Sequence, residues 1–231
     1  MASNIFQNFI SLIYPDNCAC CSRDLFRTEE SICMLCEAEL PFTKFHDIKD
    51  NPVEKTLYGR FQYQAATAFL YFSKKGLVHQ LLHELKYNNN INIGIKMGEL
   101  FGKTLQKTEK FSSFDYIVPV PLHPKKERKR GYNQALKIAE GINSVFNSTI
   151  SSKNLIRKIA NPSQTKKNRW QRWQNVSSIF TVIDSKKFEN KKVLLIDDVI
   201  TTGATLEACA QAMSNISGIE ISIACLAIPL N

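Results

Sequence analysis

The sequence lacks a long apolar run, and no basic residue precedes the interrupted apolar stretch of residues 1–17. A membrane-spanning helix needs about 20 mostly apolar residues in succession, and a secretory signal peptide begins with a basic region. We therefore expect neither a transmembrane segment nor a signal peptide, and we expect a cytoplasmic protein. Apolar residues within 3–14 instead recur at helical spacing, which predicts a short leading amphipathic helix.

Acidic residues are scarce relative to basic ones. The chain of 231 residues has 21 Asp and Glu against 30 Lys and Arg, a net charge of +9, and residues 153–175 contain no acid at all. Such an excess favours polyanionic partners, which include nucleic acid, phosphorylated metabolites and anionic membrane surfaces. The hydrophobic share of 44% is that of a globular protein with a core.

The seven cysteines do not form the pattern of a disulfide framework, because their number is odd and two CxxC pairs stand close together. Cys18 with Cys21, and Cys33 with Cys36, could enclose one tetrahedral ion, so they predict a zinc site. Four thiolates leave no open position for water, which makes the site structural. Cys20 does not fit the two-residue spacing and is taken as a spare. Redox or iron–sulfur use is the alternative.

Strands and helices are expected to alternate along the rest of the chain. This order predicts an α/β fold in which a mostly parallel sheet is flanked by helices. We expect two domains, a zinc knuckle with the leading helix at 1–45 and the α/β domain at 57–231, with a linker-like stretch at 41–56. The expected strands are 65–73, 114–122, 192–198 and 218–229, and the expected helices are 76–87, 131–146 and 204–216.

The most informative string is VLLIDDVITTGAT at 193–205, in which a buried-type strand ends in Asp197 and Asp198. A Thr- and Gly-rich turn and a helix follow, and the free N–H groups at a helix N-terminus suit a phosphate. The two carboxylates would repel that phosphate, so we expect them to accept hydrogen bonds from ribose hydroxyls. A solvated strand end with an ordinary N-cap is the alternative, and paired acids can also hold magnesium. The expected phosphate-binding residues are Thr201, Thr202, Gly203, Ala204 and Thr205.

A second cluster of cations follows the strand expected at 114–122. Lys125, Lys126, Arg128, Lys129 and Arg130 are opposed only by Glu127. A leaving pyrophosphate needs cationic and backbone donors, which this loop could provide. An ordinary solvated loop is the alternative. The residues expected to serve the pyrophosphate here are Arg128, Arg130 and Gly131.

The acid-free segment 153–175 lies between two core elements, where long polar segments often form lids or binding loops. Basic residues interleaved with aromatic ones also suit single-stranded nucleic acid, because bases stack and phosphates pair. Tryptophans that pack back on the core are the alternative. We expect lid or pyrophosphate contacts from Gln164 and Arg172, and nucleic-acid contacts from Lys166, Lys167, Arg169, Trp170 and Trp173.

Together these motifs resemble the ComF family, and the string at 193–205 resembles the phosphoribosyl pyrophosphate signature of type I phosphoribosyltransferases. The resemblance also includes LKYNNN at 85–90 and VPVPLHPKKERKRGYNQA at 118–135. It departs from the family where Asn replaces a usual Gly in LKYNNN and where Cys20 is added. The resemblance implies a type I phosphoribosyltransferase fold behind a zinc finger, and a role in handling single-stranded DNA taken up during natural transformation.

The sequence thus favours a protein that binds phosphoribosyl pyrophosphate with Mg²⁺, carries a structural Zn²⁺ and handles single-stranded DNA, with a DNA-uptake helicase or competence protein as partner. The alternative is an active phosphoribosyltransferase in which Asp197 and Asp198 are catalytic. A third hypothesis is a sensor of phosphoribosyl pyrophosphate that acts through a protein partner. Met1-Ala2-Ser3 offers no cysteine nucleophile for glutamine hydrolysis, which argues against an amidophosphoribosyltransferase.

Overall fold

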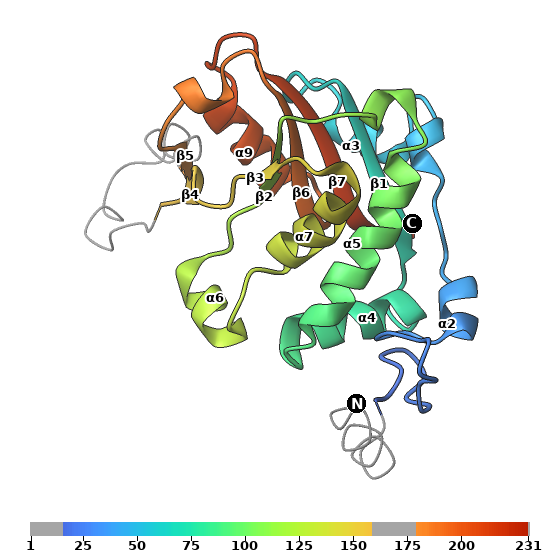
Figure 1. Cartoon of the computed structure of the whole chain (residues 1–231). Helices are drawn as coiled ribbons and strands as arrows, with labels where there is room; N and C mark the ends of the chain where they lie inside the picture. Colours follow the sequence, from blue (N-terminus) through green and yellow to red (C-terminus); the bar gives the residue numbers. More distant parts are fainter. Residues whose placement is uncertain (1–15, 159–178, 231) are drawn as a thin grey trace.

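The computed structural model describes residues 16–158 and 179–230, and its centre is a five-stranded sheet (Figure 1). The strand order is β1-β7-β6-β2-β3, and all four neighbouring pairs are parallel. This confirms the predicted α/β fold with a parallel sheet. The strands are β1 (Ala65–Phe72), β2 (Tyr116–Pro119), β3 (Thr149–Ile150), β6 (Lys192–Val199) and β7 (Glu220–Pro229).

Helices cover both faces of the sheet because the central strands are apolar on both sides. In β6, Leu194 and Ile196 pack with α4, α5 and α7, whereas Val193 and Leu195 pack with α3 and α9. Figure 1 shows α5 and α7 together on one side of the sheet. The longer helices are α4 (Leu77–Tyr87), α5 (Ile91–Leu105), α7 (Gln134–Phe146) and α9 (Ala204–Met213), and the shorter ones are α2 (Met34–Ala38), α3 (Pro52–Leu57) and α6 (Pro124–Arg130).

The remaining elements are short. Among the described residues, β4 and β5 pair antiparallel in a separate two-stranded sheet that flanks residues 159–178. The predicted leading helix at 3–14 lies outside the described residues. No helix within 16–158 and 179–230 is long and apolar enough to cross a membrane. The remaining elements are β4 (Leu155–Arg157), β5 (Phe180–Val182), η1 (Phe45–Asp47), η2 (Glu109–Phe111) and η4 (Lys186–Phe188).

The stretch 41–56 is not a linker, and that prediction is wrong. Its Asn51 is buried, accepts hydrogen bonds from the N–H groups of Val53 and Glu54 as the N-cap of α3, and donates one of 2.9 Å to the Ala66 carbonyl of β1. The N–H of Thr43 donates to the Phe69 carbonyl at 3.0 Å. These contacts bind the segment to the edge strand. They are long-range, so the local sequence pattern does not reveal them.

Helix α5 is absent from the expected helices, and its three glycines lower its intrinsic helix propensity. They recur at every fourth residue and bring α5 close to α7. A Cβ on Gly98 would lie 2.2 Å from the Ile138 carbonyl oxygen, and a Cβ on Gly141 would lie 2.0 Å from the Ile95 carbonyl oxygen. The glycines therefore allow backbone-to-backbone packing that no larger residue permits.

Substitution of Gly98 by alanine is expected to destabilise the protein by about 1–3 kcal/mol despite the better helix propensity of alanine, because the added methyl overpacks a backbone contact. Chemical denaturation of the wild type and the variant measures this difference. Lys103→Ala, at an exposed position of the same helix, serves as the control and should change stability by less than about 0.5 kcal/mol. A Gly98→Ala variant as stable as the control would contradict the close packing of α5 and α7.

Candidate functional site

Two adjacent carboxylates end β6 at the carboxyl edge of the sheet. Asp197 is partly buried, the side chain of Asp198 is 19% exposed, and the N–H of Asp198 donates to Asp197 Oδ1 at 2.8 Å. Burial, followed by the nearby charge of Asp198, raises the pKa of Asp197 to about 8. Paired acids with a perturbed pKa at the carboxyl end of a parallel strand mark a candidate functional site.

The raised pKa of Asp197 gives stability a distinct pH dependence. Between its unfolded value near 4 and about 8, the folded state binds more protons than the unfolded state, so the free energy of unfolding falls as pH rises through this window. Asp197→Asn removes the titrating group, so the free energy of unfolding of the variant does not fall in this way as pH rises. We therefore expect the variant to gain stability relative to the wild type between pH 5 and pH 8, as measured by thermal unfolding. A pH-independent difference would contradict the raised pKa.

A glycine-containing turn follows the acids directly. Gly203 adopts φ +74°, a left-handed conformation that favours glycine, and a Cβ there would lie 2.8 Å from Leu57 Cδ2 of α3. Gly203 is also the N-cap of α9 and offers no side chain to cap its first N–H groups. The N–H of Ala204 lies 3.5 Å from Thr202 Oγ1, a contact at the outer limit of a hydrogen bond, so the N–H groups at the start of α9 can still bind an anion. The hollow at this turn is lined by Asp197, Val199, Ile200, Thr201, Thr202, Gly203, Ala204, Thr205 and Leu206.

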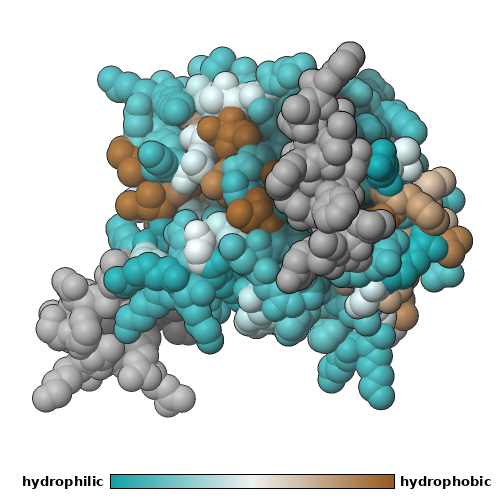
Figure 2. Space-filling view, turned by 60° about the horizontal axis from the view of Figure 1, so that its bottom comes forward, coloured by the Kyte–Doolittle hydropathy of each residue, from teal (hydrophilic) through white to brown (hydrophobic). Residues whose placement is uncertain are grey.

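The cation cluster after β2 lies on a helix, not on the predicted loop. Pro124 occupies the first turn of α6, His123 Nδ1 accepts a hydrogen bond from the N–H of Lys125 at 3.2 Å, and Gly131 ends the helix at φ +79°. Without an apolar face, the helix gave no periodic signal. None of its residues is buried. Figure 2 brings the side of α4 and α6 forward, and this face is mostly hydrophilic with scattered hydrophobic patches.

The turn after α6 connects the end of α4 with the end of β2. The Tyr132 hydroxyl donates to the Leu85 carbonyl, and the guanidinium of Arg130 lies 5.7 Å from the ring centroid of Tyr87. Asn133 is the N-cap of α7 and donates a hydrogen bond of 2.9 Å to the Val120 carbonyl. LKYNNN at 85–90 is therefore in contact with RGYNQA at 130–135. From the sequence, only the family resemblance connects these two motifs.

One residue of this site was missed. Lys86 Nζ lies 2.8 Å from Asp198 Oδ2, and the two side chains are only 21% and 19% exposed. Lys86 belongs to LKYNNN, so the motif was noticed, but its pairing with an acid far along the chain leaves no signal in the sequence. The structure thus adds a cation to the acid pair.

Several predicted site residues cannot be placed. The expected lid and nucleic-acid contacts lie outside the described residues. They are Gln164, Lys166, Lys167, Arg169, Trp170, Arg172 and Trp173.

The four predicted metal ligands come together. The sulfur atoms of Cys18, Cys21, Cys33 and Cys36 all lie within 4.8 Å of one another. The N–H groups of Cys33 and Cys20 point at Cys18 Sγ, at 3.3 and 3.4 Å. Burial alone would raise the pKa of Cys18, but these N–H groups and that of Cys21 lower it to about 6, which favours the thiolate. The donor set fits a structural zinc ion.

Cys20 is a poor ligand by comparison. Its side chain is buried, and burial followed by the charges of Cys18, Cys21 and Cys33 raises its pKa to about 12. None of the seven cysteines forms a disulfide. Cys209 and Cys225 are fully buried in the core. The structure therefore agrees with the interpretation of Cys20 as a spare.

Glu29 supports the knuckle and was not noticed in the sequence. Its carboxylate is almost fully buried, and it accepts hydrogen bonds from the N–H groups of Met34 at 2.8 Å and Phe26 at 2.9 Å. Arg23 donates to the same carboxylate at 3.0 Å. These N–H donors, more than the charge of Arg23, lower the pKa of Glu29. The contacts hold the start of α2, and with it Cys33 and Cys36.

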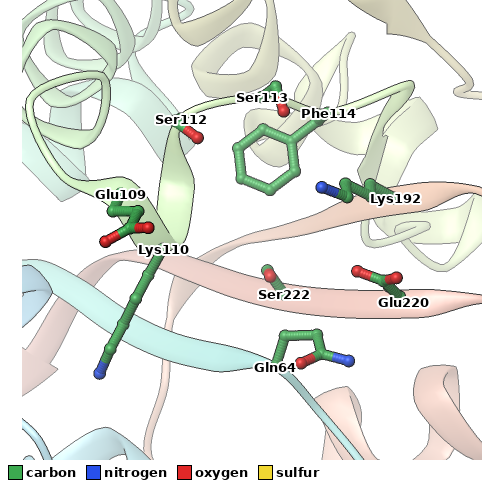
Figure 3. Close-up of a pocket in the computed structure, with 9 residues that line it drawn as sticks. All are labelled: Gln64, Glu109, Lys110, Ser112, Ser113, Phe114, Lys192, Glu220 and Ser222. Atoms are coloured by element: carbon green, nitrogen blue, oxygen red, sulfur yellow. The ribbon is translucent and has the colours of Figure 1, made fainter.

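A larger hollow lies at the opposite edge of the sheet (Figure 3). Lys192 and Glu220 begin β6 and β7, so this hollow is at the amino ends of the parallel strands. Ligands of open α/β sheets bind at the carboxyl ends, which makes the hollow beside Asp197 the better candidate. The residues that line the amino-edge hollow are Gln64, Glu109, Lys110, Ser112, Ser113, Phe114, Lys192, Glu220 and Ser222.

Comparison with known proteins agrees with this geometry. A family model described as "Phosphoribosyl transferase domain" matches residues 150–229, which include β6, the acid pair and α9. Competence protein F of Haemophilus influenzae is 27% identical over 62% of this chain and 64% of its own length. Competence protein ComFC of Bacillus subtilis is 29% identical over 62% of this chain and 55% of its own length.

The alignments to these two relatives each span less than two thirds of the relative's length. The DNA utilization protein YhgH of Escherichia coli aligns over 90% of this chain and 88% of its own length, at 24% identity. The chain is therefore similar to competence protein F, ComFC and YhgH, and its residues 150–229 match the model of the phosphoribosyl transferase domain.

Proposed function

We propose that this protein binds phosphoribosyl pyrophosphate at the carboxyl edge of β6, and that it handles single-stranded DNA during DNA uptake. One observation carries the first part. An acid pair lies next to a glycine turn at the start of α9, where Gly203 offers no side chain to cap the first N–H groups. An acceptor pair beside an anion-binding turn suits a sugar that carries a phosphate.

Each part of the site has a role in this proposal. Asp197 and Asp198 accept hydrogen bonds from the ribose hydroxyls. The N–H groups and hydroxyls of 201–205 bind the 5′-phosphate. The cations of α6 serve the pyrophosphate, whereas the predicted donor Gly131 already gives its N–H to the Glu127 carbonyl at 2.7 Å. Magnesium would neutralise part of the diphosphate charge when bound, and it stays a prediction.

Calorimetric titration with phosphoribosyl pyrophosphate and magnesium tests the ligand. We expect saturable binding to the wild type and a loss of at least about 100-fold in the Asp197→Asn/Asp198→Asn variant, because each substitution replaces an accepting carboxyl oxygen by an amide group that donates, and the charge of Asp198 is lost. Asp115→Asn, an acid whose side chain accepts from the N–H of Lys192 at the opposite edge, is the control and should bind as the wild type does. Absence of binding to the folded wild type would contradict the proposal.

The DNA part of the proposal rests on relatives named for competence and DNA utilization, and on charge. The net charge is +9, and four of the five cations of α6 are exposed, while Arg130 is half-buried and donates to Gln134 Oε1 at 2.8 Å. A cytoplasmic location and a partner in the DNA-uptake machinery belong to the same proposal. Binding to a labelled single-stranded oligonucleotide should weaken steeply as salt rises, since released counterions drive such binding. A substitution of Trp170 and Trp173 by alanine then tests the predicted stacking.

An active transferase is the second candidate, which the matched domain favours. In that reaction the bond between ribose C1 and the pyrophosphate oxygen breaks, and a nitrogen of a base or amine bonds to C1. Asp197 and Asp198 would hold the ribose while positive charge develops on it. Release of pyrophosphate in the presence of candidate acceptors, absent from the double variant, would identify this activity.

A further inference from the structure

In the free protein, Lys86 forms an ion pair with Asp198, one of the two carboxylates of the acid pair. The distance of 2.8 Å is that of a charge-assisted hydrogen bond, and both side chains are about four-fifths buried. Asp198 cannot give its full accepting capacity to a sugar hydroxyl while it holds this ammonium. A ligand that uses Asp198 must therefore share or displace Lys86.

The residues on either side of Lys86 contact the turn that the proposed function assigns to the pyrophosphate. The Leu85 carbonyl accepts from the Tyr132 hydroxyl, and the Tyr87 ring lies under the guanidinium of Arg130. The side chain of Asn89 also lies next to Gly131. Lys86 thus extends from the pyrophosphate side of the site to the ribose acids.

Lysine is suited to such an exchange because its ammonium is a point charge on a flexible stem. In phosphoribosyl pyrophosphate, the diphosphate is attached to C1, beside the hydroxyls that an acid pair would hold. A diphosphate at this place offers the ammonium a new anionic partner. A sugar without it leaves the displaced ammonium unpaired in a largely buried place, which is unfavourable.

We infer that Lys86 is a specificity-determining residue, which exchanges Asp198 for the C1 diphosphate and so selects ligands that carry this group over ribose 5-phosphate. The inference rests on the proposed function, since it takes the ribose and pyrophosphate sites from there. Lys86 thereby couples binding at the ribose site to binding at the pyrophosphate site. The ligand class it selects is a phosphorylated sugar with a diphosphate on the anomeric carbon.

Titration of two ligands into the wild type and Lys86→Gln tests this inference. Phosphoribosyl pyrophosphate should bind roughly 10- to 100-fold more weakly to the variant, because one charged hydrogen bond to the ligand is lost. Ribose 5-phosphate should bind equally well or better, because no ion pair has to be broken. The control is Lys191→Gln, in which the lysine pairs with Asp115 at the opposite edge at 3.2 Å, and it should retain the wild-type selectivity.

Each outcome has a separate meaning. Equal losses for both ligands, or no loss for either, would overturn the inference and leave Lys86 as a neutralising partner of Asp198. A folded wild type that binds neither ligand would overturn the proposed function and the inference with it. Lys86→Arg retains the cation, so it should keep most of the selectivity. If Lys86→Gln does not fold, loss of selectivity in a folded Lys86→Arg variant overturns the inference.

Discussion

Replacement of Cys33 by serine is expected to abolish zinc binding and to lower the melting temperature by at least about 10 °C. Zinc binding by small structural sites contributes about 10–16 kcal/mol to folding in finger peptides. In a chain of this size, each kcal/mol of lost stability lowers the melting temperature by about 2–4 °C, so a loss of several kcal/mol lowers it by about 10 °C or more. The knuckle packs into the same core cluster as Val78 and Leu81 of α4, so its loss also exposes part of the α/β core.

Metal content per chain and thermal unfolding measure the two effects. Cys20→Ala is the matched control, since Cys20 lies within the knuckle but outside the group of four. It should retain one zinc per chain and lose only about 1–3 kcal/mol from the small cavity. Zinc loss in Cys20→Ala, or full zinc content in Cys33→Ser, would contradict the assignment of the four ligands.

Gly203→Val is expected to weaken binding of phosphoribosyl pyrophosphate by at least roughly 10-fold, because one or more charged hydrogen bonds to the phosphate are lost. Valine is strained at φ +74°, and its Cβ would lie 2.8 Å from Leu57 Cδ2. The turn must therefore shift, which moves the N–H groups that start α9 away from the position of the phosphate.

The control for this substitution separates backbone strain from the position of the turn. Gly59 has a similar φ of +73°, but a Cβ there meets no atom within 4 Å. Because valine is strained at this φ as well, Gly59→Val should lower the free energy of unfolding by an amount comparable to Gly203→Val. It should still bind the ligand as the wild type does. Equal affinities of the two variants would contradict the role of the turn at 201–205. Calorimetric titration of both variants provides the comparison.

The parts of the fold that the sequence predicted have strong local patterns. The strand at 192–198 is a run of buried residues that ends in two acids, and the helix from Ala204 follows without a break. The two CxxC pairs are equally local, and their sulfur atoms do meet. Where one short stretch of chain contains both the structural signal and the chemistry, reading it in isolation was sufficient.

The missed features depend on contacts between distant segments. The glycines of α5 look unfavourable for a helix until α7 packs against them, and Asn51 looks like a loop residue until it bonds to β1. Lys86 reaches Asp198 only because α4 and β6 meet at the same edge of the fold. Such pairings follow from topology, which hydrophobic periodicity does not specify.

Phosphoribosyl pyrophosphate bound at the turn after β6 is the central claim, and amide chemical shifts test its location most directly. Titration of ¹⁵N-labelled protein with the magnesium complex should shift the amides of Asp198 and of residues 201–205. The amides of Ser112 and Ser222, in the hollow at the opposite edge (Figure 3), should stay unchanged. Shifts confined to the opposite edge, or none at saturating ligand, would contradict the account.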